Sequence, residues 1–327
     1  MAVVGIVFPT GNLTDPVRSE TGGPEERVYS VRQPVCCGCQ KGTIAMLLSE
    51  NLIGVLLALT SALVWGSGDF SGGLATRKTS QFQVIVLSAL SGIGILAVGA
   101  LIWRERLPSV ESAFWAMAAG AAGAVGIAAL YRALSMGHAA SVAPTAGVIG
   151  AGVPVGFSIL TQGLPGNARL AGFALAFIGI WMVSQTGTGE SRVTRLGFLL
   201  ACLAGVGFGG FFILIAQVQP GEVFIPLIAA RSMTFGVGLL LLRLNRLPFP
   251  SFKANPIALV AGVLDAGGNI FFVLARQFTS VDVAAVLSSL YPAATVLLSS
   301  LILKERISRF QGLGVAICLA AIVLITL

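Results

Sequence analysis

The chain has 327 residues, of which 56% are hydrophobic and only 10% are charged. Soluble domains carry about 25% charged residues, so this composition excludes an ordinary water-soluble protein. The net charge of +7 would suggest a nucleic-acid partner in a soluble protein, but the basic residues lie mostly in short connectors such as Arg77 and Lys78. Connector charges of this kind are membrane-topology signals, and we expect no nucleic-acid partner.

Residues 1–45 differ in kind from the rest of the chain. They mix charged residues with Gly, Pro and Ser and show no periodicity, which predicts a disordered tail. The short opening apolar run lacks a basic lead, unlike a secretory signal. Met46 directly precedes the first long apolar stretch and is an alternative start. Cys36, Cys37 and Cys39 lack the further spaced ligands of a zinc site, so we expect no metal.

Ten apolar stretches follow and continue to the last residue. They cover about 52–75, 80–103, 112–136, 139–160, 168–186, 195–217, 221–243, 255–276, 279–303 and 309–327. Each is close to the roughly 20 residues that cross a bilayer, and all are too long for the strands of a membrane barrel. A helix satisfies its own backbone polar groups in lipid. The sequence therefore predicts an all-α integral membrane protein with ten transmembrane helices.

The first five stretches resemble the last five. Corresponding positions include Gly54 and Gly197, Trp65 and Phe208, and Gly172 and Gly314. We interpret residues 51–186 and 195–327 as two copies of a five-helix repeat. Because five is odd, copies joined in series cross the membrane in opposite senses, which predicts an inverted repeat.

Basic residues in alternate connectors predict the orientation of the helices. More of them lie on the side that holds Arg77, Arg192, Arg195, Arg243, Arg246, Lys253 and Arg309. Because cytoplasmic loops carry the excess of Lys and Arg, this side is predicted to be cytoplasmic and both chain ends external.

Two charged residues lie near the middle of apolar stretches. Arg231 falls in 221–243 and Asp265 in 255–276, and antiparallel neighbours would hold them at similar depth. Charges inside a membrane need a partner, a wet cavity or a function. An ion pair would offset part of their desolvation, either as a clamp between two helices or as part of a binding or proton-coupling site. Asn269 lies one turn after Asp265 on the same face.

Trp65 and Asp69 lie in a glycine-rich run late in the first stretch. Two interpretations of Asp69 are open: it lines a cavity, or it lies at the membrane interface and pairs with Arg77 or Lys78.

Two tyrosines are further candidates for the lining of a site. Tyr131 ends the third stretch, where an interfacial anchor is the alternative role. Tyr291 lies at mid-depth beside Pro292 and either contacts a ligand or is a hydrogen-bonded core residue. His138, the single histidine, lies in a connector and is assigned no role.

Prolines occur in corresponding stretches of the two halves. Pro144 and Pro154 lie in the fourth and Pro292 in the ninth. Interrupted helices in matching positions indicate a binding site near the membrane midplane, whereas kinks that only aid packing are the alternative.

Several motifs of enzymes and cofactor-binding proteins are absent from the sequence. It contains no HExxH, P-loop, GxSxG or dinucleotide fingerprint. We therefore expect neither an enzyme nor a cofactor, and any transport would run on a gradient. The alternatives are an intramembrane lipid-modifying enzyme, which would need clustered His, Asp or Ser near an interface, and a membrane scaffold without transport.

The second half resembles the EamA-like branch of the drug/metabolite transporter superfamily. The resemblance lies in the helix that leads to Tyr291 and Pro292, the Glu305-Arg306 turn and the glycine-led last helix at Gly314. Trp65 and Gly66 are similar to the family's Trp-Gly at the end of its first helix. The resemblance implies ten helices around a central cavity that carries small metabolites or drugs, usually outward.

The first half departs from the family's pattern. Gly163 stands where the family has the Glu of its Glu-Arg turn. The position equivalent to Pro292 is Ala151, with Pro154 shifted by one turn.

The hypothesis is a secondary transporter in the cell membrane that works by alternating access. Its cavity is predicted between the first, third, fourth, sixth, eighth and ninth stretches. The candidate lining residues are Trp65, Asp69, Tyr131, Arg231, Asp265, Asn269 and Tyr291, and Asp265 is the candidate proton-titrating group. The expected partners are a small-molecule substrate, H⁺ as the candidate coupling ion, and membrane lipid.

Overall fold

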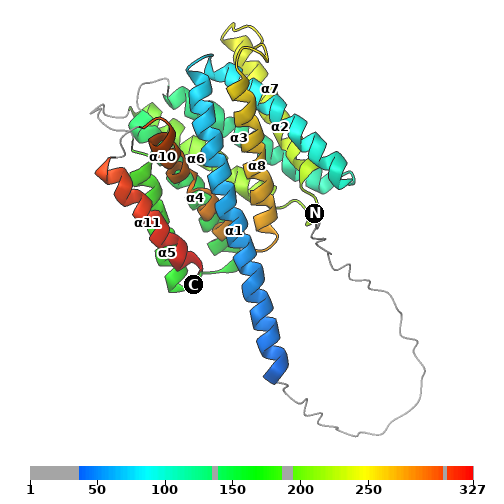
Figure 1. Cartoon of the computed structure of the whole chain (residues 1–327), viewed down its shortest axis with the longest axis vertical. Coiled ribbons are helices and arrows are strands. Elements are labelled where there is room, and N and C mark those ends of the chain that lie inside the picture. The colour runs from blue at the N-terminus through cyan, green and yellow to red at the C-terminus, as the bar shows by residue number, and fades with distance from the viewer. Residues whose placement is uncertain (1–36, 135–138, 186–193, 305–307, 327) are drawn as a thin grey trace, which may run out of the picture. The chain divides into compact units, whose positions relative to one another are not determined.

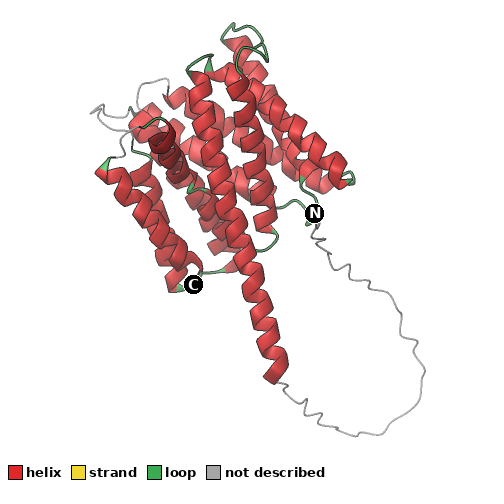
Figure 2. Ribbon diagram, in the orientation of Figure 1, coloured by secondary structure: helices red, strands yellow, loops and turns green. Residues whose placement is uncertain are grey.

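A computed structural model of the chain describes residues 37–134, 139–185, 194–304 and 308–326. All regular structure in these ranges is helical (Figure 2). Cys36, His138 and the Glu305-Arg306 turn lie outside the described residues. The chain divides into two compact units, residues 1–42 and 43–327, and the second unit contains all the membrane-spanning segments found.

The helices follow one another as predicted from the apolar stretches (Figure 1). They are α1 (Cys37–Thr76), α2 (Gln81–Trp103), α3 (Val110–Leu134), α4 (Ala139–Gln162), α5 (Asn167–Val183), α6 (Arg195–Ile215), α7 (Phe224–Leu244), α8 (Pro256–Arg276), α9 (Val281–Ser288), α10 (Tyr291–Ile302) and α11 (Arg309–Thr326). Nine described segments are long and apolar enough to span a membrane, with α9 and α10 together forming one of them. The 17 residues of α5 extend about 26 Å, close to the thickness of the hydrocarbon core. The prediction of an all-α membrane protein is confirmed.

Helix α1 begins earlier than the sequence predicted. Its first turns, from Cys37, fall inside residues 1–45, which we expected to be a disordered tail. Good helix formers such as Gln40, Lys41 and Ala45 allow the helix to extend backwards from the membrane span Asn51–Thr76.

The ninth predicted span is interrupted directly before Pro292. Helix α9 ends at Ser288 and α10 begins at Tyr291. All eight residues of α9 are buried. The interruption therefore lies inside the protein, where irregular backbone is tolerated within a membrane.

Helix α4 shows no corresponding interruption. It continues through Pro144 and Pro154, so the expected helix breaks at these two prolines are wrong. Pro154 has no N–H and leaves the carbonyl of Gly150 without its helical partner. Helix α6 approaches at this point so closely that a Cβ added at Gly209 would lie 3.0 Å from that carbonyl oxygen. Helix α6 therefore packs directly against the carbonyl that Pro154 leaves free.

Glycines allow corresponding helices of the two halves to pack against each other in antiparallel fashion. Between α5 and α11, Gly172 lies against Ile325 and Gly314 against Val183. The start of each helix thus meets the end of the other, as Figure 1 shows for this pair. Small residues permit such close backbone approach, which drives helix association in lipid.

The same relation holds between α2 and α7. Gly99 lies against the ring of Phe224, and Gly238 lies against Ile85. Both contacts join the end of one helix to the beginning of the other. In each of the helix pairs α2–α7 and α5–α11, a glycine contact made by the first-half helix is therefore matched by an equivalent contact made by the second-half helix.

Two sets of hydrogen bonds tie the connectors of one half to those of the other. The carboxylate of Glu105, after α2, accepts bonds from the N–H groups of residues 223–225, at distances of 2.8 Å for Phe224 and Ile225. It thereby caps the positive end of α7. Before α8, Asn255 donates to the carbonyl of Ala75 and to the hydroxyl of Thr79, both at 2.8 Å.

Candidate functional site: a central cavity lined by both halves

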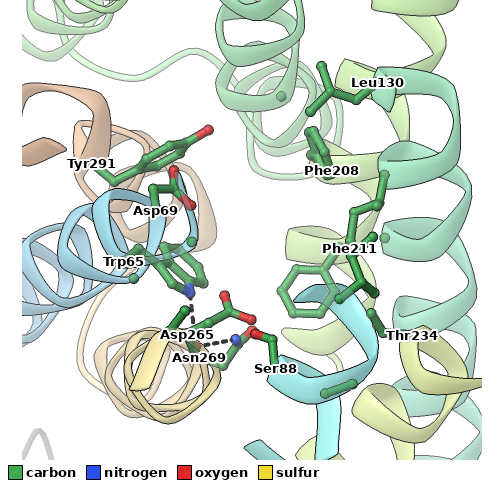
Figure 3. A pocket seen from close by; sticks show the side chains of 18 of the residues that line it. Trp65, Asp69, Ser88, Leu130, Phe208, Phe211, Thr234, Asp265, Asn269 and Tyr291 are labelled. Carbon is green, nitrogen blue, oxygen red and sulfur yellow. Dashed lines mark hydrogen bonds between the residues drawn. The ribbon is translucent and has the colours of Figure 1, made fainter. Parts of the chain in front are cut away.

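A cavity of about 480 Å³ lies within the bundle. Its lining comes from α1, α2, α3 and α4 of the first half, from α6, α7 and α8 of the second half, and from the junction of α9 and α10. Asp69, Asp265 and Asn269 lie on one side, opposite Leu130, Phe208 and Phe211 (Figure 3). Ligand pockets typically measure about 300 to 1,000 Å³, so this cavity can hold a small molecule.

The structure brings six of the seven predicted lining residues to this cavity. They are Trp65, Asp69, Arg231, Asp265, Asn269 and Tyr291. The seventh, Tyr131, lies in the last turns of α3, but its side chain is outside the described part of the structure.

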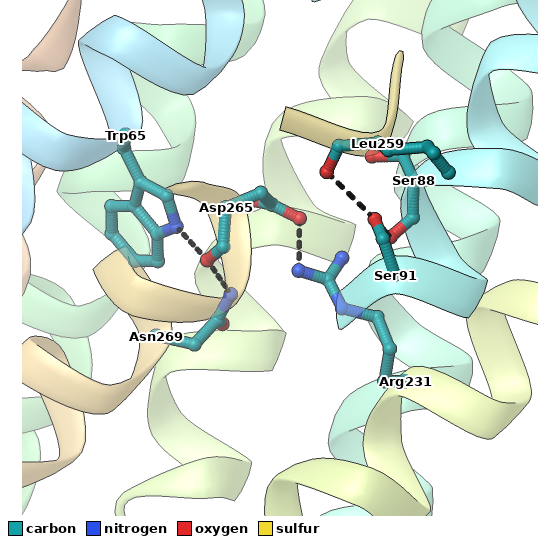
Figure 4. A network of polar contacts seen from close by, with 7 residues as sticks. All are labelled: Trp65, Ser88, Ser91, Arg231, Leu259, Asp265 and Asn269. Atoms are coloured by element: carbon teal, nitrogen blue, oxygen red, sulfur yellow. Dashed lines mark hydrogen bonds and ion pairs between the residues drawn. The ribbon is translucent and has the colours of Figure 1, made fainter. Parts of the chain in front are cut away.

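Arg231 of α7 and Asp265 of α8 form an ion pair between Nη2 and Oδ2 (Figure 4). The arginine side chain is 12% exposed and the aspartate side chain 39% exposed, because the carboxylate faces the cavity. A Cβ added at Gly92 of α2 would lie 3.1 Å from Nε of Arg231, so that glycine makes room for the guanidinium. The pair both links two helices and forms part of the cavity wall.

The backbone carbonyl of Asp265 holds two further lining residues in place. Trp65 Nε1 donates to it at 3.1 Å, and Asn269 Nδ2 donates at 2.6 Å. The indole of Trp65 lies so close to Gly268 that no Cβ fits there. Trp65 therefore joins α1 of the first half to α8 of the second.

Aromatic packing behind Trp65 makes this wall rigid. The ring of Trp65 lies 5.7 Å from Phe212 and 6.1 Å from Phe272, and these two phenylalanines are 4.8 Å apart. Aromatic pairs at such distances contribute about 0.5 to 1.5 kcal/mol each beyond their burial. The cluster fixes the indole as part of the cavity surface.

Asp69 lies in the cavity, which decides between the two interpretations of this residue. Its side chain is exposed to the cavity, beside the ring of Tyr291 (Figure 3). One turn earlier on α1, Gly66 packs against the backbone carbonyl of Tyr291, and Thr295 Oγ1 donates to the carbonyl of Gly66 at 3.1 Å. These contacts fix Asp69 relative to the junction of α9 and α10.

The predicted list of lining stretches omitted α2 and α7, although Arg231 of α7 was among the candidate lining residues. Helix α2 contributes Ser88, and α7 contributes Thr234 one turn after Arg231. Polar side chains inside otherwise apolar stretches were the available signal. At the junction, Ser289 also lines the cavity. Within the described ranges no cluster of His, Cys, Asp and Glu is suited to a metal ion.

Residues 195–327 match the family model described as the EamA-like transporter family. This confirms the resemblance found in the second half of the sequence. Solved structures include 29 matching chains. One of them, titled only "Crystal structure of protein", has a TM-score of 0.67 and 19% identity over 83% of this chain and 95% of its own. At this identity the similarity shows the fold alone. A comparison with curated proteins finds no match.

Proposed function

We propose, since residues 195–327 match the model of the EamA-like transporter family, that the chain is a secondary transporter exporting small metabolites or drugs across the cell membrane. The observation that carries this proposal is the cavity of about 480 Å³ with Asp69, Arg231 and Asp265 in its wall. Charged side chains inside a membrane bundle are costly unless they serve a pathway or a site.

The proposed mechanism is alternating access between two inverted repeats, residues 51–186 and 195–327. The repeated antiparallel contacts of α2 with α7 and of α5 with α11 support this symmetry. So do the bonds of Glu105 and Asn255, because each joins the connector after the second helix of one half to the connector before the second helix of the other half. Rocking of one half against the other would open the cavity to each side in turn.

The two alternative functions fit the geometry less well. A scaffold without transport tolerates a closed apolar interior, whereas this interior is hollow and charged. A lipid-modifying enzyme needs a polar cluster near the membrane interface, whereas Asp69, Asp265 and Asn269 face the central cavity. Lipid products made by the purified protein would favour the enzyme.

Replacing Asp265 with Asn should abolish transport driven by a pH gradient while leaving the protein folded. Asparagine keeps the size of the side chain and a hydrogen-bond acceptor for Arg231 but cannot ionise. The measurement is flux of labelled cationic, neutral and anionic metabolites in proteoliposomes with an imposed gradient, with Glu111→Gln, on the exposed first turn of α3, as the control. Unchanged flux would remove Asp265 from proton coupling, and no flux with the unaltered protein would contradict a transporter.

Equivalent connectors of the two halves should face opposite sides of the membrane. Lys78, between α1 and α2, and Gln219, between α6 and α7, are both exposed. Single cysteines at these positions, in a chain without its native cysteines, should react with a membrane-impermeant thiol reagent from opposite sides. Labelling of both from the same side would contradict the inverted repeat.

A further inference from the structure

We propose that the cavity selects organic cations, with the ammonium or similar group held at Asp69 and an apolar body against the opposite wall. The claim that such cations are transported rests on the proposed function. The claim that the cavity binds them can be tested by a binding measurement alone. Three features of the cavity support it.

The first feature is the charge of the lining. Among the described residues that line the cavity, Asp69, Asp265 and Arg231 are the charged ones. Arg231 is paired with Asp265, whereas no ion pair joins Asp69 to another described residue. One carboxyl group is therefore left without a cationic partner. In a cavity with low-dielectric walls a carboxylate attracts cations more strongly than it would in water.

The second feature is the end of α9. The helix stops at Ser288, and the following Ser289 lines the cavity. Pro292 cannot donate to the carbonyl of Ser288, so this carbonyl at the end of the buried helix α9 has no helical partner and is available to a cation. Ends of interrupted helices that expose carbonyls coordinate cations in transporters. Because α1 packs against Tyr291 at Gly66, this helix end and Asp69 belong to the same part of the site.

The third feature is the aromatic surface. Trp65, Phe208, Phe211 and Tyr291 all line the cavity. A cation over the face of such a ring is attracted by the negative charge density of the ring, more strongly when the cation is desolvated. Ile127 and Leu130 add apolar surface. The wall thus suits a cation that also carries an apolar group.

The same features exclude an anion as the preferred ligand. Arg231 is the single cationic side chain among the described lining residues, and it is paired with Asp265. An anion would have to displace that carboxylate and remain close to Asp69. Both steps are unfavourable, so charge selectivity follows from the arrangement of three side chains.

The test uses two aromatic ions of similar size and opposite charge, phenyltrimethylammonium and benzenesulfonate. Their binding to the purified full chain in detergent is measured by equilibrium dialysis. We expect saturable binding of phenyltrimethylammonium and none of benzenesulfonate. Asp69→Asn should weaken the binding of phenyltrimethylammonium at least about ten-fold, equivalent to about 1.4 kcal/mol, because it removes the carboxylate charge that attracts the quaternary ammonium in a cavity of low dielectric constant.

Two control variants keep this test decisive. Glu111→Gln removes the same charge from an exposed position outside the cavity and should leave binding unchanged. Asp69→Glu retains the charge and should restore binding, which separates loss of charge from loss of fold. Equal binding of benzenesulfonate, no binding of phenyltrimethylammonium, or full affinity in Asp69→Asn would overturn the proposal.

The flux assay separates this inference from the proposed function. Transport of anionic or neutral metabolites by a protein that binds no phenyltrimethylammonium would overturn the cation site and leave the transporter in place. Binding that depends on Asp69, together with no flux of any metabolite class, would support the cation site and contradict the transporter.

Discussion

Replacing Arg231 with Met should lower the thermal stability of the protein. The substitution leaves the carboxylate of Asp265 without its cation inside the bundle. Removing one partner of a fully buried pair costs about 3 to 5 kcal/mol. Because Asp265 is 39% exposed to the cavity, water compensates part of this cost, and we expect a loss of about 1 to 3 kcal/mol. The measurement is the apparent melting temperature of the purified protein at a fixed heating rate.

A second variant distinguishes the two functions that the sequence left open for this pair. Arg231→Met combined with Asp265→Leu removes both charges and should regain most of the lost stability, because the uncompensated carboxylate is gone. If the double variant is stable and still transports, the pair is a clamp between α7 and α8. If it is stable but inactive, the pair belongs to the binding or coupling site. An Arg231→Met variant as stable as the unaltered protein would contradict the ion pair itself.

The membrane fold and the Arg231–Asp265 pair were both predictable for the same physical reason. Hydrocarbon forces each backbone to satisfy its own polar groups, so the apolar stretches mark the helices directly. The same stretches also give the depth of every residue. Arg231 and Asp265 lie at similar depth in consecutive stretches, and the structure pairs them. Depth along a helix is therefore readable from the sequence.

Rotation of a helix about its axis is not readable in this way. In a soluble protein the polar face of a helix points to water, but in lipid both the core and the surroundings are apolar. Ser88 and Thr234 stand out as polar residues in apolar stretches, but their polarity alone did not indicate that they face the cavity. Their direction depends on contacts with other helices, such as that of Gly92 with Arg231.

The effect of a proline also depends on the neighbouring helix. Pro292 follows an interruption, whereas α4 continues through Pro154, and a Cβ added at Gly209 of α6 would lie 3.0 Å from the carbonyl oxygen that this proline leaves free. The sequence pattern of α4 alone holds no information about that contact.

The largest steric effect is expected from Gly262→Ala in α8. A Cβ at this position would overlap the backbone carbonyl of Ser88 and the hydroxyl of Ser91 in α2. The hydroxyl of Ser91 can rotate away at the cost of its 2.9 Å bond to the carbonyl of Leu259, but the carbonyl of Ser88 is fixed by the helix. The two helices must therefore separate, and overpacking of this kind costs about 1 to 3 kcal/mol or more.

Substitutions at two further glycines serve as controls for this prediction, and the melting temperature is again the measurement. Gly94 of α2 has no atom within 4 Å of an added Cβ, so Gly94→Ala should be neutral or stabilising by up to about 1 kcal/mol. A Cβ added at Gly120 of α3 would meet the carbonyl of Ala230 in α7. In the two repeats α3 corresponds to α8 and α7 to α2, so this contact is the equivalent of that between Gly262 and α2. Gly120→Ala should therefore cost as much as Gly262→Ala. If Gly262→Ala instead melts at the temperature of Gly94→Ala, α2 and α8 do not approach as closely as described.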